Sequence, residues 1–215
     1  MSKSSSRLGH LRRATVLGTK VYLRPFEHDD ITDEYLDWVN DKSINSYILA
    51  TGFPISRDRA VEYIENSQPP HAAYFAICDI VTGTHIGNAR LSLIDWINRV
   101  ATYGRILGHD DFRGKGYGSD ALVQLLRYGF HQLGLNRIWS SAVAENLESL
   151  GSNDKVGMSR EGKIREYVYA NGKFHDTIIL AMLRRDFDEL HGGPDHWLEH
   201  ERDSRKNFAE LSRSK

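Results

Sequence analysis

Three glycines alternate with other residues in the segment Arg113-Gly114-Lys115-Gly116-Tyr117-Gly118. The segment follows a run with the alternation of a strand and precedes leucines at helical spacing. Glycines at such a junction let backbone N–H groups approach phosphate oxygens, and the start of a helix favours an anion. Arg113 and Lys115 add positive charge beside the turn. The segment therefore predicts a binding site for a pyrophosphate group.

Two familiar phosphate motifs do not fit this spacing. The dinucleotide fingerprint requires a third glycine where the chain has Ser119. The P-loop requires glycine at His109 and a hydroxyl residue at Gly116. Nucleoside triphosphates and NAD are thus disfavoured, and the remaining alternative is a glycine-rich connector that binds no ligand.

The segment 113–118 resembles the R/Q-x-x-G-x-G/A coenzyme-A motif of the GCN5-related N-acetyltransferases (GNAT family). The order of expected strands and helices from about Lys20 to Arg185 is similar to that family as well. Three further segments resemble its RimJ/RimL-like branch, namely Leu135-Asn136-Arg137-Ile138, Glu145-Asn146 and Lys155-Val156-Gly157-Met158.

This resemblance implies acetyl-CoA as the cosubstrate, with its pantetheine arm between two splayed strands, Tyr103 to Gly108 and Arg137 to Val143. It further implies that Asn146 contacts the cofactor, although an asparagine there also suits the cap at a strand end. The other cofactor-binding positions it implies are Ile106, Leu107 and Gly108 beside the pantetheine, and Arg113, Gly114, Lys115, Gly116, Tyr117, Gly118 and Ser119 at the pyrophosphate.

Acetyl transfer to an amine needs a neutral nucleophile, N–H donors for the developing oxyanion and a proton for the departing thiolate. Many family members supply that proton from a tyrosine, but the matching position here is Asn153, whose amide is no useful acid. Asn153 is expected to orient the sulfur or thiolate, or else protonation comes from solvent or from a residue such as Ser152. The general base stays open among His109, Tyr103, Glu145 and His175, each of which also suits a solvated or capping role.

The order of the expected strands and helices predicts a single α/β (α+β) domain. Its sheet is mixed and mostly antiparallel, with about seven strands, and is flanked by helices. Asp29 or Asp30 is expected to cap a first helix and Ser56 a second. Asn171-Gly172 favours a tight type I′ hairpin. Strands are expected at 20–25, 73–80, 85–94, 100–108, 137–143, 163–170 and 173–183, with helices after the glycine turn and at 149–156.

Three regions are expected along the chain: a flexible arm at 1–14, the acetyltransferase domain at 15–186, and a charged, partly helical tail at 187–215. The arm is too polar for a signal peptide or a membrane span. Cys78, the one cysteine, excludes a disulfide within the chain and fits a reducing, cytoplasmic location. Trp96, at a strand end, is the aromatic residue that could contact an acceptor.

The 28 Lys and Arg residues nearly balance the 29 Asp and Glu residues, so nothing in the overall charge suggests nucleic acid or a membrane as partner. We expect no metal site, because adjacent side chains in His28-Asp29-Asp30 and His109-Asp110-Asp111 do not converge readily.

The predicted function is acetyl-CoA-dependent transfer to a primary amine, which is a protein amino terminus, an amino sugar, a polyamine or an aminoglycoside. The alternative is an acetyl-CoA-binding module with little or no turnover. An acidic lining of the acceptor pocket would favour a polycation. A homodimer is a further possibility.

Overall fold

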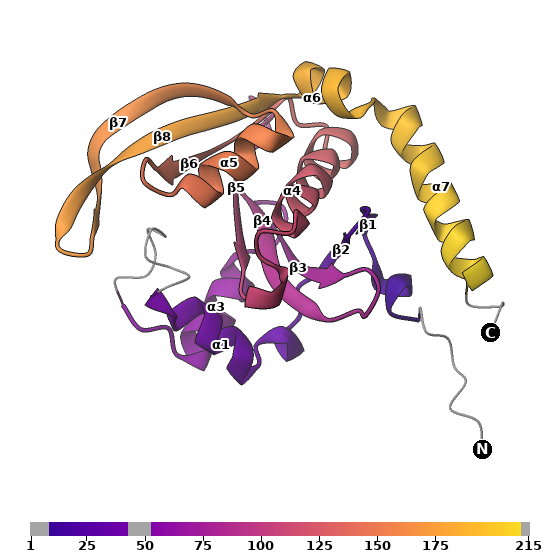
Figure 1. Cartoon of the computed structure of the whole chain (residues 1–215), viewed down its shortest axis with the longest axis horizontal. Helices are drawn as coiled ribbons and strands as arrows, with labels where there is room; N and C mark the ends of the chain where they lie inside the picture. The colour runs from indigo at the N-terminus through magenta and orange to yellow at the C-terminus, as the bar shows by residue number, and fades with distance from the viewer. Residues whose placement is uncertain (1–8, 43–52, 212–215) are drawn as a thin grey trace.

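The computed structural model describes residues 9–42 and 53–211, and within them one mixed sheet organises the fold (Figure 1). The strands lie in the order β1-β2-β3-β4-β5-β6-β8-β7, and neighbouring strands are antiparallel except for the parallel pair β5 and β6. Their bounds are β1 Val16–Leu17, β2 Val21–Pro25, β3 Ala73–Asp79, β4 His85–Asp95, β5 Val100–Leu107, β6 Arg137–Val143, β7 Ser159–Ala170 and β8 Lys173–Leu183.

The sheet has eight strands rather than about seven. The additional strand is β1, a two-residue segment that pairs with β2 and is too short to leave an alternating pattern. Strand β7 begins at Ser159, earlier than the expected residue 163, because its exposed, polar first half carries no apolar alternation.

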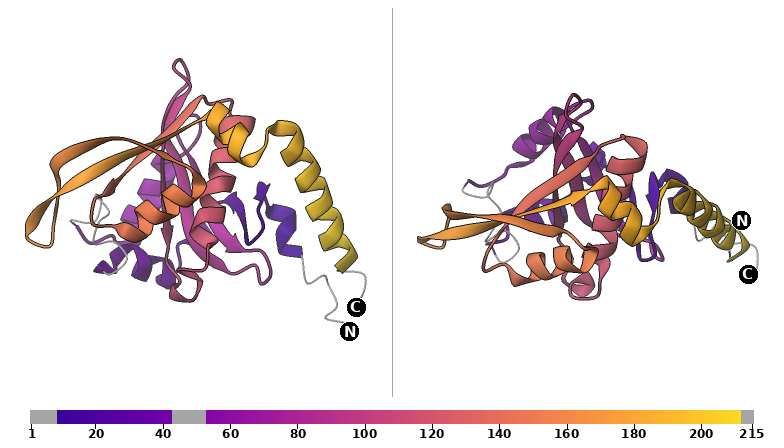
Figure 2. Two further views of the ribbon diagram at one scale, coloured as in Figure 1. Left: turned by 45° about the horizontal axis from the view of Figure 1, so that its top comes forward. Right: turned by 90° about the horizontal axis from the view of Figure 1, so that it is seen from above.

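Helices cover both faces of the sheet. On one face lie α1 (Asp33–Asn40) and α3 (Arg57–Asn66), and on the other α4 (Tyr117–Arg127), α5 (Leu147–Val156) and α6 (Arg184–His191) (Figures 1 and 2). Helix α7 (Pro194–Leu211) follows α6. Short helical turns occur at Gly9–Arg13, His28–Asp30 and Asp110–Phe112, and a π-helical turn at Tyr128–Gln132 extends α4.

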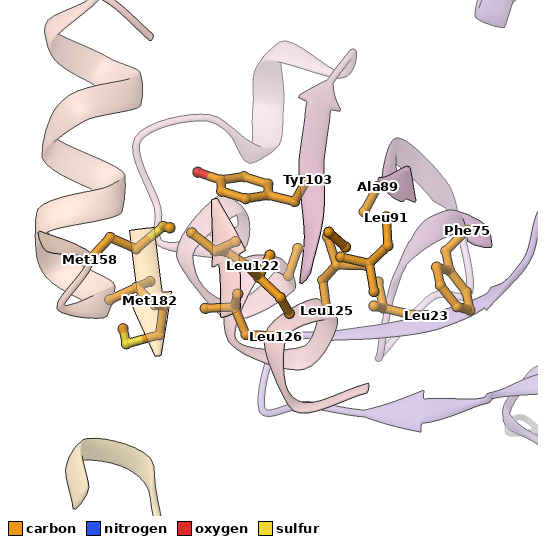
Figure 3. Close-up of a cluster of buried hydrophobic side chains, with 14 of the residues drawn as sticks. Leu23, Phe75, Ala89, Leu91, Tyr103, Leu122, Leu125, Leu126, Met158 and Met182 are labelled. Atoms are coloured by element: carbon orange, nitrogen blue, oxygen red, sulfur yellow. The ribbon is translucent and has the colours of Figure 1, made fainter. Parts of the chain in front are cut away.

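Side chains that alternate along the strands pack into two separate hydrophobic cores, one on each face of the sheet. In β3, Phe75 and Ile77 pack into the α4 side, whereas Ala76 and Cys78 pack into the α1 and α3 side. Figure 3 shows the larger core, where Leu122, Leu125 and Leu126 of α4 lie between Met182 of β8 and Leu91 of β4. These leucines are fully buried, so α4 and the glycine turn at its start are held firmly against the sheet.

The starts of the early helices confirm one sequence prediction and correct another. Ser56 caps α3, because its side chain accepts from the backbone N–H of Arg59. The cap of α1 is Thr32 rather than Asp29 or Asp30, and its side chain accepts from the N–H of Tyr35 at 3.1 Å. Asp30 instead accepts two hydrogen bonds of 2.6 Å from the guanidinium of Arg24.

The β7–β8 hairpin extends away from the rest of the sheet (Figures 1 and 2). Its turn confirms the Asn-Gly prediction, since Asn171 and Gly172 have φ values of 51° and 80°. The outer strand β7 is exposed along almost its whole length.

Strands β5 and β6 separate after a short stretch of pairing, as the family resemblance implied. Their parallel ladder ends at Thr102 and Trp139, after three residue pairs. Beyond that point β5 continues on β4 and β6 continues on β8. The carboxyl-terminal halves of β5 and β6 are thus not paired with each other, and this divergence is here called the strand split.

The turn at Gly9–Arg13 and the carboxyl end of α7 lie on the same side of the molecule (Figure 1). Of the expected arm, residues 1–8 lie outside the described residues, and Leu11 in the following turn is buried. In the tail, Trp197 of α7 packs 4.8 Å from the guanidinium carbon of Arg127. None of the described helices has the length and apolar character that a membrane crossing requires.

Candidate active site

The glycine-rich turn lies between the end of β5 and the start of α4. Gly114 and Gly116 have φ values of 69° and 86°, a left-handed conformation that favours glycine. A Cβ built on Gly114 would meet nothing within 4 Å, so the turn is open on that side. Gly116 is the N-cap of α4 and offers no side-chain acceptor to the first N–H groups of the helix. The turn therefore combines free space with backbone donors, as an anion site requires.

Asp120 fixes the start of α4 to the turn that precedes β2. Its carboxylate accepts from the backbone N–H groups of Thr19, Lys20 and Val21, at 3.1, 2.7 and 2.9 Å. A Cβ on Gly18 would lie 2.6 Å from Asp120 Oδ2, so glycine is needed for this approach. The contact orients the helix start that carries the turn.

The side chains of Arg113 and Lys115 differ in role. The guanidinium of Arg113 donates to the carbonyl oxygen of Leu107 at 2.8 Å and pairs with Asp110 at 3.1 Å. Arg113 thus ties the turn to the end of β5, whereas Lys115 is exposed. The Arg113 side chain is therefore engaged with protein partners.

Ile106 and Leu107 lie on the strand split, and Gly108 follows directly. One edge of this segment bonds to β4, and beyond Thr102 the other edge has no partner in β6. The half-buried Arg105 links the split to the helix, because its guanidinium donates to the carbonyl oxygen of Gly118. Burial lowers the pKa of Arg105, and the nearby Tyr103 opposes that effect.

Asn146 caps α5, with Oδ1 accepting from the N–H of Ser149 at 3.0 Å. Ser152, one turn along α5 from Ser149, lies with its hydroxyl 2.9 Å from that of Ser119 in α4. The two helices that flank the split are therefore joined by a direct polar contact.

Asn153 is buried, with 1% of its surface exposed, and both ends of its amide have protein partners. Its Nδ2 donates to the carbonyl oxygen of Ser149 at 2.8 Å, and its Oδ1 accepts from the hydroxyl of Tyr103. The phenol of Tyr103 on β5 therefore reaches the position on α5 that the sequence singled out.

The other base candidates lie apart from this contact. His175 Nδ1 is 3.2 Å from Glu145 Oε1, just beyond the end of β6, and this hydrogen bond lowers the pKa of Glu145. His109 lies after β5, with Nε2 3.8 Å from Glu34 of α1. Trp96 lies at the opposite end of β5 from Gly108, and its indole donates to the carbonyl oxygen of Pro70.

An acid-lined pocket of about 660 Å³ opens beside the end of β5, between α1 and the segment 108–111. Trp38 and Gly108 are part of its lining, and a Cβ on Gly108 would lie 1.9 Å from the indole of Trp38. Gly108 therefore belongs both to the strand split and to this pocket. Its described lining includes five carboxylates and neither Lys nor Arg, the acids being Glu34, Asp37, Asp41, Asp110 and Asp111.

Among the residues that the structure describes, no group of three or more His, Cys, Asp or Glu side chains is placed to hold a metal ion.

The split strand pair and the open glycine turn at the start of the next helix are features of one protein family, and sequence comparison identifies that family. A sequence model of the family described as "Acetyltransferase (GNAT) domain" matches residues 20–159. The chain belongs to this family, and it is an acyltransferase.

Three relatives show how far the similarity extends. "Uncharacterized N-acetyltransferase p20" of Bacillus licheniformis is 30% identical over 176 residues, which cover 80% of this chain and 98% of that protein. Spermidine N(1)-acetyltransferase of Escherichia coli K12 is 25% identical over 179 residues, covering 81% and 91%. The crystal structure of spermidine N-acetyltransferase from Vibrio cholerae in complex with CoA and spermine superposes with a TM-score of 0.72 at 24% identity, covering 78% and 98%.

Sequence reasoning missed three residues that shape the site. Asp120 and Arg105 act on backbone groups distant in sequence, and neither is marked by a motif. The one signal was a charged residue within an apolar strand or at a helix start. Nothing in the sequence around Trp38 indicated that it contacts Gly108.

Proposed function

We propose that this protein transfers the acetyl group of acetyl-CoA to a primary amine of a polyamine. The observation that carries the proposal is the strand split, which ends at an open glycine turn on one side and at the acid-lined pocket on the other. One site is suited to an anionic cofactor and the other to a cationic acceptor, with Gly108 between them.

The cofactor half of the proposal assigns the pyrophosphate to the backbone of the glycine turn. The pantetheine arm then runs along the unpaired edge of β5, and Asn146 holds the start of α5 beside it. Asn153 acts on the sulfur through Tyr103. The residues proposed for the cofactor are Ile106, Leu107, Gly108, Arg113, Gly114, Lys115, Gly116, Tyr117, Gly118, Ser119 and Asn146.

The acceptor half rests on charge. Five carboxylates around one pocket create a negative potential that attracts polycations and repels the phosphates of the cofactor. The Vibrio cholerae relative has a structure in complex with CoA and spermine, which is a polyamine. An amino sugar carries at most one positive charge and gains less from such a lining than a polyamine does, so polyamines are the preferred class.

The test is a free-thiol assay with acetyl-CoA and a panel of amines: spermidine, spermine, an amino sugar, an aminoglycoside and a peptide with a free amino terminus. We expect thiol release that requires both substrates and is fastest with a polyamine, with mass spectrometry showing a singly acetylated product. Turnover confined to the peptide would refute the acceptor class. Tight acetyl-CoA binding without transfer to any amine would favour the binding-module alternative.

We propose three finer assignments. The segments around Leu135, Glu145 and Lys155 support membership of the RimJ/RimL-like branch. Division of the chain into an arm, a domain at 15–186 and a tail can be tested by limited proteolysis. The exposed edge of β7 supports a homodimer, which sedimentation at several concentrations would test.

A further inference from the structure

We propose that the hydroxyl of Tyr103 is the proton donor to the coenzyme A thiolate, so that the donor lies on β5 rather than on helix α5. The inference rests on the proposed function and deepens it. It assigns a catalytic residue to a chain whose α5 presents an asparagine, and it gives Asn153 the role of positioning Tyr103.

Tyr103 lies where the strand split begins. It is the residue after Thr102, where pairing between β5 and β6 ends, so it lies at the narrow end of the strand split. From Leu107 back to Tyr103 the strand spans roughly 13 Å at 3.3 Å per residue. A pantetheine arm that starts at the glycine turn and follows β5 therefore directs its terminal sulfur toward Tyr103.

The hydroxyl of Tyr103 points toward α5. Figure 3 shows the Tyr103 ring above Leu122, with the hydroxyl on the side of Met158. The hydroxyl donates to Oδ1 of Asn153, whose own amide is fixed by the carbonyl of Ser149 at 2.8 Å. The hydroxyl of Tyr103, a residue of β5, thus contacts α5 through Asn153 and β6 through Ser140.

The electrostatic surroundings suit an acid that gives up its proton and recovers it. Burial raises the pKa of Tyr103, so the phenol is protonated at neutral pH. The charge of Arg105 opposes this shift, as does the hydrogen bond with Ser140. Arg105 therefore stabilises the phenolate that proton donation leaves behind.

The proton balance closes without another reagent. The amine nitrogen bonds to the thioester carbon, the C–S bond breaks, and its electron pair goes to sulfur. The phenol proton moves to that thiolate and yields the free thiol. The nitrogen loses one proton to water, and the phenolate recovers one from water, so the enzyme ends each turnover unchanged.

Other nearby groups are poorer donors. The amide of Asn153 does not ionise usefully. The hydroxyl of Ser152 is a much weaker acid than a phenol and is already in contact with Ser119. Tyr103 combines acidity with a place at the narrow end of the split.

The test compares Tyr103→Phe with Tyr128→Phe, which removes a hydroxyl from another core-packed tyrosine. We expect Tyr103→Phe to lower kcat about a hundredfold or more, as loss of a general acid does, with acetyl-CoA affinity by calorimetry near the wild-type value. Tyr128→Phe is expected to retain wild-type kcat. Turnover of Tyr103→Phe close to that of the wild type would overturn the inference and leave the proposed function intact.

A second measurement separates proton donation from a structural role and does not depend on removing the hydroxyl. Replacing Tyr103 with 3,5-difluorotyrosine keeps the ring and lowers its pKa. The alkaline limb of the kcat profile should then move to lower pH. An unmoved limb would overturn the inference, and absence of transfer by the wild-type chain would overturn it together with the proposed function.

Discussion

Gly108→Ala is the perturbation that most directly probes the junction between the two proposed substrate sites. The added Cβ would lie 1.9, 2.3 and 2.4 Å from three atoms of the Trp38 indole. Because carbon atoms pack at about 3.5–4.0 Å, the indole or the end of β5 must move by roughly 1.5–2 Å. The backbone has little freedom to move, since the N–H of Gly108 donates to Ile86 at 3.1 Å.

Overpacking of this kind costs about 1–3 kcal/mol of unfolding free energy. A shift of about 1 Å in groups that position a substrate is sufficient for a hundredfold loss of activity. We therefore expect Gly108→Ala to lower both the urea midpoint and kcat/KM. The control is Gly162→Ala on the exposed strand β7, where a Cβ meets nothing within 4 Å. That control should change stability by no more than about 0.5 kcal/mol.

A double-mutant cycle tests the cause. Trp38→Ala removes the indole and by itself costs about 3–5 kcal/mol. If the clash with Trp38 is the reason for the effect, Gly108→Ala should cost far less in the Trp38→Ala background, with a coupling energy of about 1–3 kcal/mol. Additive losses, or a Gly108→Ala protein with wild-type stability and turnover, would refute this reasoning.

Three further predictions concern the turn, an ion pair and the pocket. Gly116→Ala and Gly134→Ala both place a Cβ at positive φ without a close contact and should each cost about 1–2 kcal/mol in urea unfolding, but calorimetry should show weaker acetyl-CoA binding for Gly116→Ala alone. Burial raises the pKa of Asp30, but the hydrogen bond from its partner Arg24 lowers it, and the net shift is downward. The carboxylate therefore stabilises the fold fully above a pH of about 4, and this stabilisation is lost as the pH falls through the folded-state pKa. Asp30→Asn should accordingly cost about 3–5 kcal/mol at pH 7, and the difference from the wild type should narrow in acid. Asp37→Asn should raise the spermidine KM about threefold to tenfold, less so in high salt, while the matched charge loss in Glu189→Gln should leave it unchanged.

Local signals in the sequence were sufficient for much of the fold. Alternation and turn residues located the strands, Ser56 marked a helix start, and Asn171-Gly172 marked a hairpin. These features depend on neighbouring residues, so a single sequence reveals them. The short β1 and the polar half of β7 were missed because neither carries an apolar pattern.

The site was less predictable because its contacts join distant parts of the chain. The glycine turn showed where a phosphate could bind, but not that Asp120 anchors the helix to residues 19–21. Asn153 marked a departure from the family pattern, but the partner 50 residues earlier, Tyr103, emerged from tertiary packing. The acidic lining of the pocket likewise depends on α1 packing beside the end of β5.

A crystal structure of the protein with acetyl-CoA or CoA tests the central claim most directly. The account predicts the pyrophosphate on the backbone N–H groups of the turn at 114–118, the pantetheine arm between β5 and β6, and the sulfur within hydrogen-bond reach of the Tyr103 hydroxyl. A cofactor bound outside the strand split would contradict the proposed function. A cofactor in the split whose sulfur lies far from Tyr103 would contradict the assignment of the proton donor.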